Sequence, residues 1–206
     1  MIEIWWVLLV AVLLVLGWYL SYTASRLDRL HAKVTAARTA LDVQLLRRRM
    51  ASIEAARYLD PASALLVTDA ASRALTAAEQ DEEGRAGEVR DPLEVPSYLE
   101  PTESEVSRAL LMAFPDGLDL PEGAGAGLSL LPGGPSATPF ADDARRQLVQ
   151  ACTRVQLARR LHNDAVAQAQ RVRDKRVVRW AHLAGRAPVP QMIEFDDALP
   201  PGLSEV

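Results

Sequence analysis

Apolar residues are distributed differently in the first twenty positions and in the rest of the chain. Residues 4–20 (IWWVLLVAVLLVLGWYL) contain no charged side chain, and Trp or Tyr residues lie near both ends of this run. The run is close to the ~20 residues that a helix needs to cross a bilayer, and such aromatic residues favour the two membrane–water interfaces. The pattern predicts a transmembrane anchor over residues 1–20, in contact with the lipid bilayer through residues 4–20.

A cleavable signal peptide is the competing interpretation of this run. It would need a basic start and small residues before the cleavage site. Here the run follows MIE, which lacks Lys and Arg, and ends in Trp18 and Tyr19. These flanks favour an uncleaved anchor.

The charges on either side of the run predict its orientation. Glu3 precedes it, whereas Arg26, Arg29, Lys33 and Arg38 follow it. Because positively charged flanks stay in the cytoplasm, we expect a single-pass protein of the cell membrane. Its N-terminus would lie outside and everything from residue 21 onward would be cytoplasmic.

Beyond the anchor, apolar residues recur at intervals of three and four, which is typical of amphipathic helices. One such helix is predicted from a cap at Ser25 to about Leu59, where Pro61 ends it, and a second follows over residues 62–80. Together they form a helical hairpin over residues 21–81. The apolar positions of the two helices are Leu27, Leu30, Val34, Ala37 and Leu41, then Leu65, Leu66, Ala70, Leu75 and Ala78.

The middle of the chain, residues 82–140, breaks this pattern. It contains an acidic linker with prolines and a Gly/Pro-rich loop without periodicity. Between them, Thr102 and Glu105 have the spacing of a capping box, which predicts a short helix to about Phe114.

The most regular helix is predicted within residues 141–187. No Pro or Gly occurs from Asp142 to Ala184, and eight residues fall on a heptad seam. The tail, residues 188–206, is acidic and contains prolines, so we expect it to be extended. The seam residues are Leu148, Ala151, Val155, Ala158, His162, Ala165, Ala169 and Val172.

Composition and charge narrow the fold and the partners. Aromatic residues make up only 5 % of the 206 residues, and the chain is rich in Ala, Leu and Arg, which favours packed helices over sheets. The net charge of −4 argues against a nucleic-acid-binding protein. Residues 60–105 hold twelve acids and three arginines, whereas residues 145–186 hold only two acids. These two regions could attract each other within the chain.

Three consecutive arginines, Arg47, Arg48 and Arg49, interrupt the first long helix. Successive residues turn by about 100° on a helix, so the three side chains cannot all face the same way. We expect at least one to face the bundle and pair with an acid. The alternatives are a solvated face or contact with a partner.

Two segments carry a resemblance to a known family. ALDVQLLRRR (residues 40–49) resembles the IDVQLKRR signature of the LemA family, and ARRLHNDAVAQAQ (residues 158–170) is similar to its AR..YNDAV..YN helix. QMIEFDD (residues 191–197) takes the place of the family's acidic-aromatic FFE ending. The chain differs where MASIEAA replaces the family's LIPNLV turn and where Ala169 and Gln170 replace a second Tyr-Asn. The resemblance is that of a divergent member in which the acidic linker and the Gly/Pro loop are insertions.

The resemblance implies an all-α fold: an N-terminal transmembrane helix followed by a cytoplasmic antiparallel helical bundle with long helices. It implies no established reaction. We expect Asn163 and Asp164 to bond between helices, with Arg47 or Arg48 paired to Asp164 and Arg49 solvated. The matched residues, which we take as structural or partner candidates, are Asp42, Gln44, Arg47, Arg48, Asn163 and Asp164.

The residues offer little for catalysis. The three histidines lack metal-ligand spacing, and Cys152 is the only cysteine. GAGAG at residues 123–127 has no preceding strand or following helix, so it is not a phosphate-binding loop. We predict no catalytic residues, no metal and no cofactor, and we interpret His162 and Cys152 as core residues.

A non-enzymatic scaffold or accessory subunit of a membrane protein complex is therefore the favoured function. It would act through a membrane-protein partner or by self-association. The alternatives are a regulator of a membrane-surface enzyme and a protein that binds anionic lipid through its last helix, whose basic residues could also pair with the acidic middle of the chain. The lipid or partner candidates are Arg171, Arg173, Lys175, Arg176 and Arg179.

Overall fold

The computed structural model describes residues 2–84, 93–115, 139–180 and 188–203. Within these ranges the chain is helical and contains no strand, so the predicted all-α bundle is confirmed. The expectations for the Gly/Pro loop and for part of the acidic linker concern residues outside these ranges. The elements are α1 (Ile2–Ala56), α2 (Pro61–Gly84), α3 (Leu99–Ala113), α5 (Pro139–Arg173), α6 (Arg176–Trp180) and a 3₁₀ turn (Pro201–Leu203).

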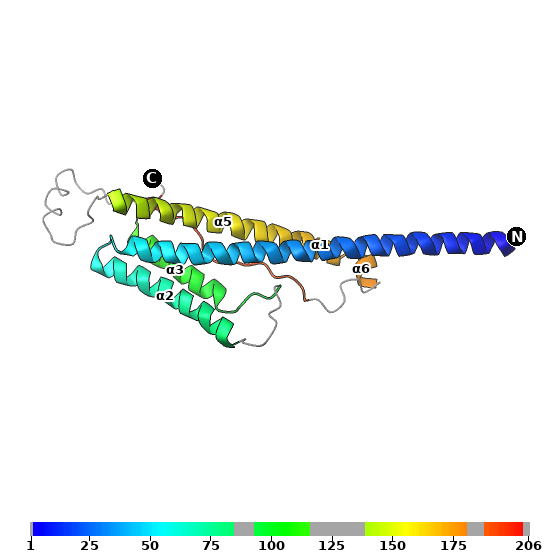
Figure 1. Ribbon diagram of the computed structural model, residues 1–206, viewed down its shortest axis with the longest axis horizontal. Coiled ribbons are helices and arrows are strands. Elements are labelled where there is room, and N and C mark those ends of the chain that lie inside the picture. The colour runs from blue at the N-terminus through cyan, green and yellow to red at the C-terminus, as the bar shows by residue number, and fades with distance from the viewer. Residues whose placement is uncertain (1, 85–92, 116–138, 181–187, 204–206) are drawn as a thin grey trace.

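Helix α1 is one continuous helix with two different halves. Its N-terminal half projects beyond the other helices, and its C-terminal half lies in the middle of the bundle (Figure 1). The apolar segment in the projecting half is fully exposed and is long and apolar enough to cross a membrane. The predicted cap at Ser25 is wrong because Ser25 lies inside α1, where no proline interrupts the helix.

Helices α1 and α5 form the most extensive helix pair. All eight predicted seam residues of α5 are buried, and Leu27, Val34 and Leu41 of α1 are buried against them. The pairing of Leu27 with Val172 near one end and Leu41 with Val155 further along shows that the two helices are antiparallel. The heptad spacing therefore identified the main interface of the bundle correctly.

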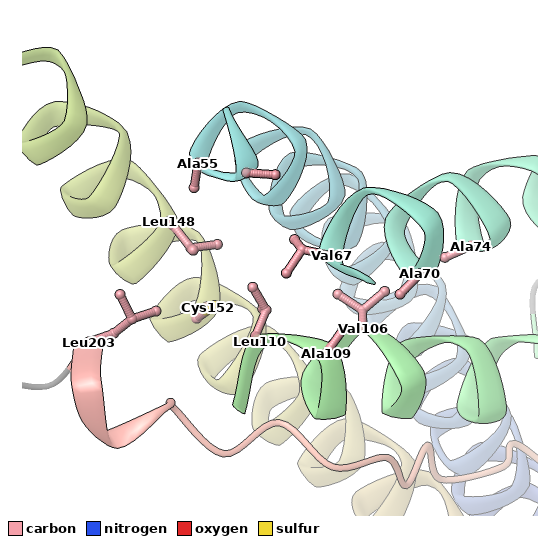
Figure 2. Close-up of a cluster of buried hydrophobic side chains, with 11 residues drawn as sticks. Ala55, Val67, Ala70, Ala74, Val106, Ala109, Leu110, Leu148, Cys152 and Leu203 are labelled. Atoms are coloured by element: carbon pink, nitrogen blue, oxygen red, sulfur yellow. The ribbon is translucent and has the colours of Figure 1, made fainter. Parts of the chain in front are cut away.

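Helices α2 and α3 pack together beside the C-terminal half of α1, at the end of the bundle far from the apolar segment (Figure 1). Figure 2 shows side chains from these two helices converging with Leu148 and Cys152 of α5 and with Leu203 of the tail. The predicted core positions Leu65 and Leu66 are wrong, because both are exposed. The buried face of α2 is instead formed by smaller residues, which allow close helix packing: Val67, Ala70, Ala71 and Ala74.

The ends of α1, α2 and α3 follow local capping rules. Helix α1 ends at Ala56, three residues earlier than expected, and Asp60 caps α2 by accepting hydrogen bonds from the N–H groups of Ala62 and Ser63 at 3.1 and 3.2 Å. Hydrogen bonding from the Ser63 side chain, and then from its backbone N–H, lowers the pKa of the Asp60 carboxyl. The predicted capping box of α3 is wrong: Thr102 lies inside the helix and its hydroxyl donates to the carbonyl of Tyr98 at 2.8 Å.

The last helix ends earlier than its sequence pattern predicts. Helix α5 stops at Arg173, a turn follows at Asp174 and Lys175, and α6 then packs Val178 against Leu27 of α1. The tail is extended over residues 188–200, as expected. It is not a peripheral segment, however, because Ile193, Phe195 and Leu203 are buried in the bundle.

Candidate functional site

The centre of the bundle holds a cluster of charged residues. Arg48 and Arg49 of α1 are almost fully buried, and both are ion-paired to Glu103 of α3, which has no exposed surface. Arg49 Nε donates to one carboxylate oxygen at 2.7 Å, and Arg48 binds the other. Arg48 also donates to the hydroxyl of Ser107 at 3.1 Å and to the carbonyl of Glu103 at 3.2 Å. Two consecutive arginines thus fasten α3 to α1.

The tail completes this cluster. The ring of Phe195 lies near the guanidinium groups of both Arg48 and Arg159, whose central carbons are 5.5 and 5.7 Å from the ring centroid. These distances suit attraction between a cation and the face of an aromatic ring. Arg159 of α5 is held in place by two bonds to the carboxylate of Asp197, at 2.7 and 3.0 Å. The cluster therefore joins α1, α3, α5 and the tail.

Charge balance in this cluster suits a structural role. Two guanidinium groups share one carboxylate, and the carbonyl, the hydroxyl and the aromatic face supply further acceptors for the excess positive charge. Arginine stays protonated in proteins, and both oxygens of Glu103 are engaged. The carboxylate of Glu103 therefore bridges the two arginines.

Side chains of α5 bind the backbone of the tail along its length. Asn163 donates to the carbonyl of Ile193 and accepts from its N–H, both at 3.0 Å. Since an extended chain buried without strand neighbours needs other partners for its polar groups, these bonds explain how the tail is accommodated. The pairs run antiparallel from one end of α5 to the other: Arg173 with Pro188, Gln170 with Pro190, His162 with Gln191, Gln156 with Asp197 and Arg145 with Gly202.

The buried His162 and Cys152 behave as core residues. His162 Nε2 donates to the carbonyl of Gln191 at 3.3 Å, and Nδ1 has no hydrogen-bond partner among the residues that the structure describes. Burial lowers the pKa of His162; the bond to Gln191 opposes this shift, and the nearby Arg38 charge reinforces it. Burial also raises the pKa of the Cys152 thiol. A neutral imidazole and a protonated thiol are therefore favoured in the folded protein.

The structure corrects the expected roles of the three arginines. Either Arg47 or Arg48 was expected to face the bundle, and Arg47 is exposed. Arg49, expected to be solvated, is buried. Arg48 faces the bundle as anticipated, but it pairs with Glu103 and not with the exposed Asp164. The expectation failed because the acid that Arg48 and Arg49 reach lies on α3, whereas Asp164 of α5 is exposed.

The remaining residues of the two family-like motifs are dispersed. Asp42 pairs with the buried Arg38 of its own helix at 3.2 Å, and Gln44 is half-buried beside α5. Asn163 bonds the tail, so the expected bond between helices is wrong. Asp164 is exposed. The motifs therefore do not converge on one pocket.

An open face is formed by the outer sides of α1 and α5. One hollow in it is lined by Leu46, Arg47 and Met50 from α1 and by Ala151 and Arg154 from α5. Leu157 and Leu161 continue the exposed side of α5 one and two turns beyond Arg154. This open face, which we define by Val43, Leu46, Arg47, Met50, Arg154, Leu157 and Leu161, carries five apolar side chains that are at least 42 % exposed.

The basic residues at the end of α5 separate into two groups. Arg173 Nη1 donates to the carbonyl of Pro188 at 2.8 Å and so belongs to the α5 side chains that bind the tail. Arg171, Lys175, Arg176 and Arg179 are exposed. Two acids of the middle region bind other elements: Glu103 binds α1, and Glu105 binds Arg73 of α2.

Sequence reasoning missed Glu103, Arg49, Arg159 and Phe195. The alternation of Ile193 and Phe195 is a strand-like signal that could have revealed the buried tail.

Comparison with protein-family models, characterised proteins and solved structures finds no match to this chain. In the ranges that the structure describes, no group of His, Cys, Asp and Glu side chains is arranged to hold a metal ion.

Proposed function

We propose that this chain is a membrane-anchored scaffold or accessory subunit of LemA type, which holds a membrane-protein partner on the open face of α1 and α5. The observation that carries the proposal is the five exposed apolar side chains of that face. Three of them lie on α1, the helix that carries the apolar run, and two lie on α5 beside it. Val43 is 23 residues beyond Leu20, which at 1.5 Å per residue is about 35 Å past the apolar run, so a membrane protein would meet this face with a part that extends out of the bilayer.

The composition of the open face supports a protein partner. Met and Arg are enriched in protein interfaces and Leu supplies apolar area, and contiguous exposed apolar patches mark interaction sites. Leu46 and Met50 flank Arg47, and Arg154 lies across the same hollow. A partner helix would fit this pattern if it placed apolar residues against Leu46 and Met50 and an acidic residue opposite Arg47 and Arg154.

Charge argues against two parallel copies of this chain as the complex. In a twofold dimer about an axis along the membrane normal, equivalent surfaces face each other. Arg47 and Arg154 line the same hollow and thus lie at the same height along the bundle. Four arginines would meet in such a dimer, and like charges across an interface are unfavourable. A different partner protein is favoured.

The proposal includes a membrane-spanning anchor with the bundle in the cytoplasm. The basic residues that follow the apolar run support this orientation. Reporters that are active only in the cytoplasm or only outside it, fused after Val206, would test it. We expect activity of the cytoplasmic reporter alone; activity of the exterior reporter would contradict the orientation.

The LemA relationship remains part of the proposal and is supported by where the motif residues lie. Arg48 of the first motif and Asn163 of the second both make buried or half-buried bonds that hold the bundle together. Because Glu103 is fully engaged by arginines, the central cluster is better suited to stability than to catalysis.

Affinity purification of the full chain from membranes in mild detergent, followed by mass spectrometry, tests the partner. We expect a membrane protein in stoichiometric amount. The double variant L157K/L161K should lose it, while the matched variant L65K/M112K, also on exposed apolar residues but outside the open face, should keep it. Recovery of the chain alone, or equal recovery of partner by both variants, would contradict this use of the face.

A further inference from the structure

The basic end of the bundle lies beside the projecting half of α1. Helix α6 packs on α1 through Val178 and Leu27, and Val172 of α5 joins the same contact (Figure 1). Leu27 is seven residues beyond Leu20, which at 1.5 Å per residue places this contact about 10 Å past the end of the apolar run. The headgroup layer of a bilayer extends about 5–8 Å beyond its hydrocarbon core. Long basic side chains at this contact can reach it.

Charge at this end of the bundle is strongly positive. Residues 21–30 and 171–180 carry seven Arg and Lys residues against two acids, Asp28 and Asp174. The two segments are far apart in sequence and are brought together by the antiparallel pairing of α1 with α5 and the turn before α6. The fold thus brings the basic residues of these two segments together at the end of the bundle nearest the apolar run.

A hollow at this level has the lining expected for a phosphate group with an apolar neighbour. Arg26 of α1 and Arg171 and Lys175 of α5 and the following turn supply positive charge, and Gln168 supplies an amide. Leu30 and Val172 supply apolar surface between the helices. Lys33 donates to the oxygen of Gln168 at 3.2 Å, which directs a further positive charge toward the same place.

We propose that Arg26, Arg171, Lys175, Arg176 and Arg179 form a membrane-facing collar that binds the phosphate groups of anionic lipids. The inference rests on the membrane anchoring in the proposed function, and it adds a ligand that the partner face does not use. Arg173 is excluded from the collar because it is bonded to the tail at Pro188. The collar sets the height and tilt of the bundle against the membrane.

The test uses the full chain in mild detergent, titrated with phosphatidylglycerol and separately with phosphatidylcholine, with bound lipid counted by native mass spectrometry. We expect the wild type to prefer phosphatidylglycerol by at least about tenfold. Each basic residue near an anionic surface contributes about fivefold in affinity. The variant R171Q/K175Q/R179Q should therefore bind phosphatidylglycerol on the order of a hundredfold more weakly.

A matched control removes the same charge far from the membrane. Arg57, Arg108 and Arg160 are exposed and lie at least about 30 Å past the apolar run, several screening lengths away. The variant R57Q/R108Q/R160Q should keep the wild-type preference. The inference is wrong if the two triple variants bind lipid equally. It is also wrong if inorganic phosphate binds the wild type as tightly as phosphatidylglycerol does, because the ligand is then a soluble phosphate.

Alkaline carbonate extraction of membranes separates failure of the collar from failure of the anchor. If the wild-type chain is released, the anchoring in the proposed function is wrong and the collar falls with it. If the wild type and both variants stay in the membrane but none prefers anionic lipid, only the collar is wrong.

Discussion

Arg49 of α1 and Glu103 of α3 are 54 residues apart in sequence and form an ion pair in which both side chains are buried. Arg48 binds the other oxygen of the same carboxylate. A buried charge that loses its partner destabilises a fold by roughly 3–5 kcal/mol. One acid thus holds α3 against α1.

The three neighbouring arginines should therefore differ sharply in mutational effect. We expect Arg48→Ala or Arg49→Ala to lower the free energy of unfolding by roughly 2–3 kcal/mol, because each removes buried hydrogen bonds to the charged carboxylate of Glu103. The exposed Arg47→Ala should change it by less than about 0.5 kcal/mol. Chemical denaturation of the full chain in mild detergent measures all three. Equal, small effects would show that Arg48 and Arg49 are solvated.

Combining changes isolates the pair itself. Arg49→Ala with Glu103→Ala should be less destabilising than the sum of the two single changes, by about 1–3 kcal/mol, because residues that share a network couple. Arg47→Ala with Glu103→Ala should be additive. Coupling of Glu103 to Arg47 and not to Arg49 would contradict the arrangement in the centre of the bundle.

The tail should stabilise the bundle although it has no regular structure over residues 188–200. Phe195→Ala removes a buried ring that contacts two arginines, and should lower the free energy of unfolding by about 3–5 kcal/mol. Gly202→Ala should also destabilise, because a Cβ there would lie 2.6 Å from the carbonyl oxygen of Pro115. The exposed Val189→Ala is the matched control. Unchanged unfolding of the first two variants would place the tail outside the bundle.

Acidification should weaken the fold through His162. The folded-state pKa of His162 is lowered by burial, so below the unfolded value of about 6.5 the unfolded chain binds a proton that the folded chain does not. Stability should therefore fall as pH decreases from about 6.5, by up to about 1.4 kcal/mol per pH unit. His162→Gln should remove this slope in denaturation curves between about pH 6.5 and 5.5, above the titration of ordinary carboxyls. An identical slope in the variant would show that His162 is not responsible.

The α1–α5 interface was predictable because it depends on local periodicity. Leu27, Val34 and Leu41 are spaced seven residues apart, and the seam residues of α5 follow the heptad repeat over six turns or more. The break at Asp174 was not predictable, since no Pro or Gly marks it; packing of Val178 on Leu27 accompanies it. The sequence pattern alone therefore did not show where the last helix ends.

The buried cluster was only half predictable. Helical geometry alone required that Arg47, Arg48 and Arg49 point in different directions. Their assignment depended on which helix lies opposite, and residues 60–105 offered twelve acids as partners. Glu103 could not be distinguished from the exposed acids by sequence pattern. The resemblance of Arg47 and Arg48 to a paired motif then favoured the wrong pair.

The most direct test of the central proposal is photo-crosslinking in native membranes. A photoreactive amino acid at Leu157, on the open face, should crosslink the full chain to an integral membrane protein. The same probe at Leu65, which is equally apolar and even more exposed but lies on α2, should not. Crosslinks from both positions or from neither, or crosslinks from Leu157 only to further copies of this chain, would contradict the account of a scaffold that holds a different membrane protein.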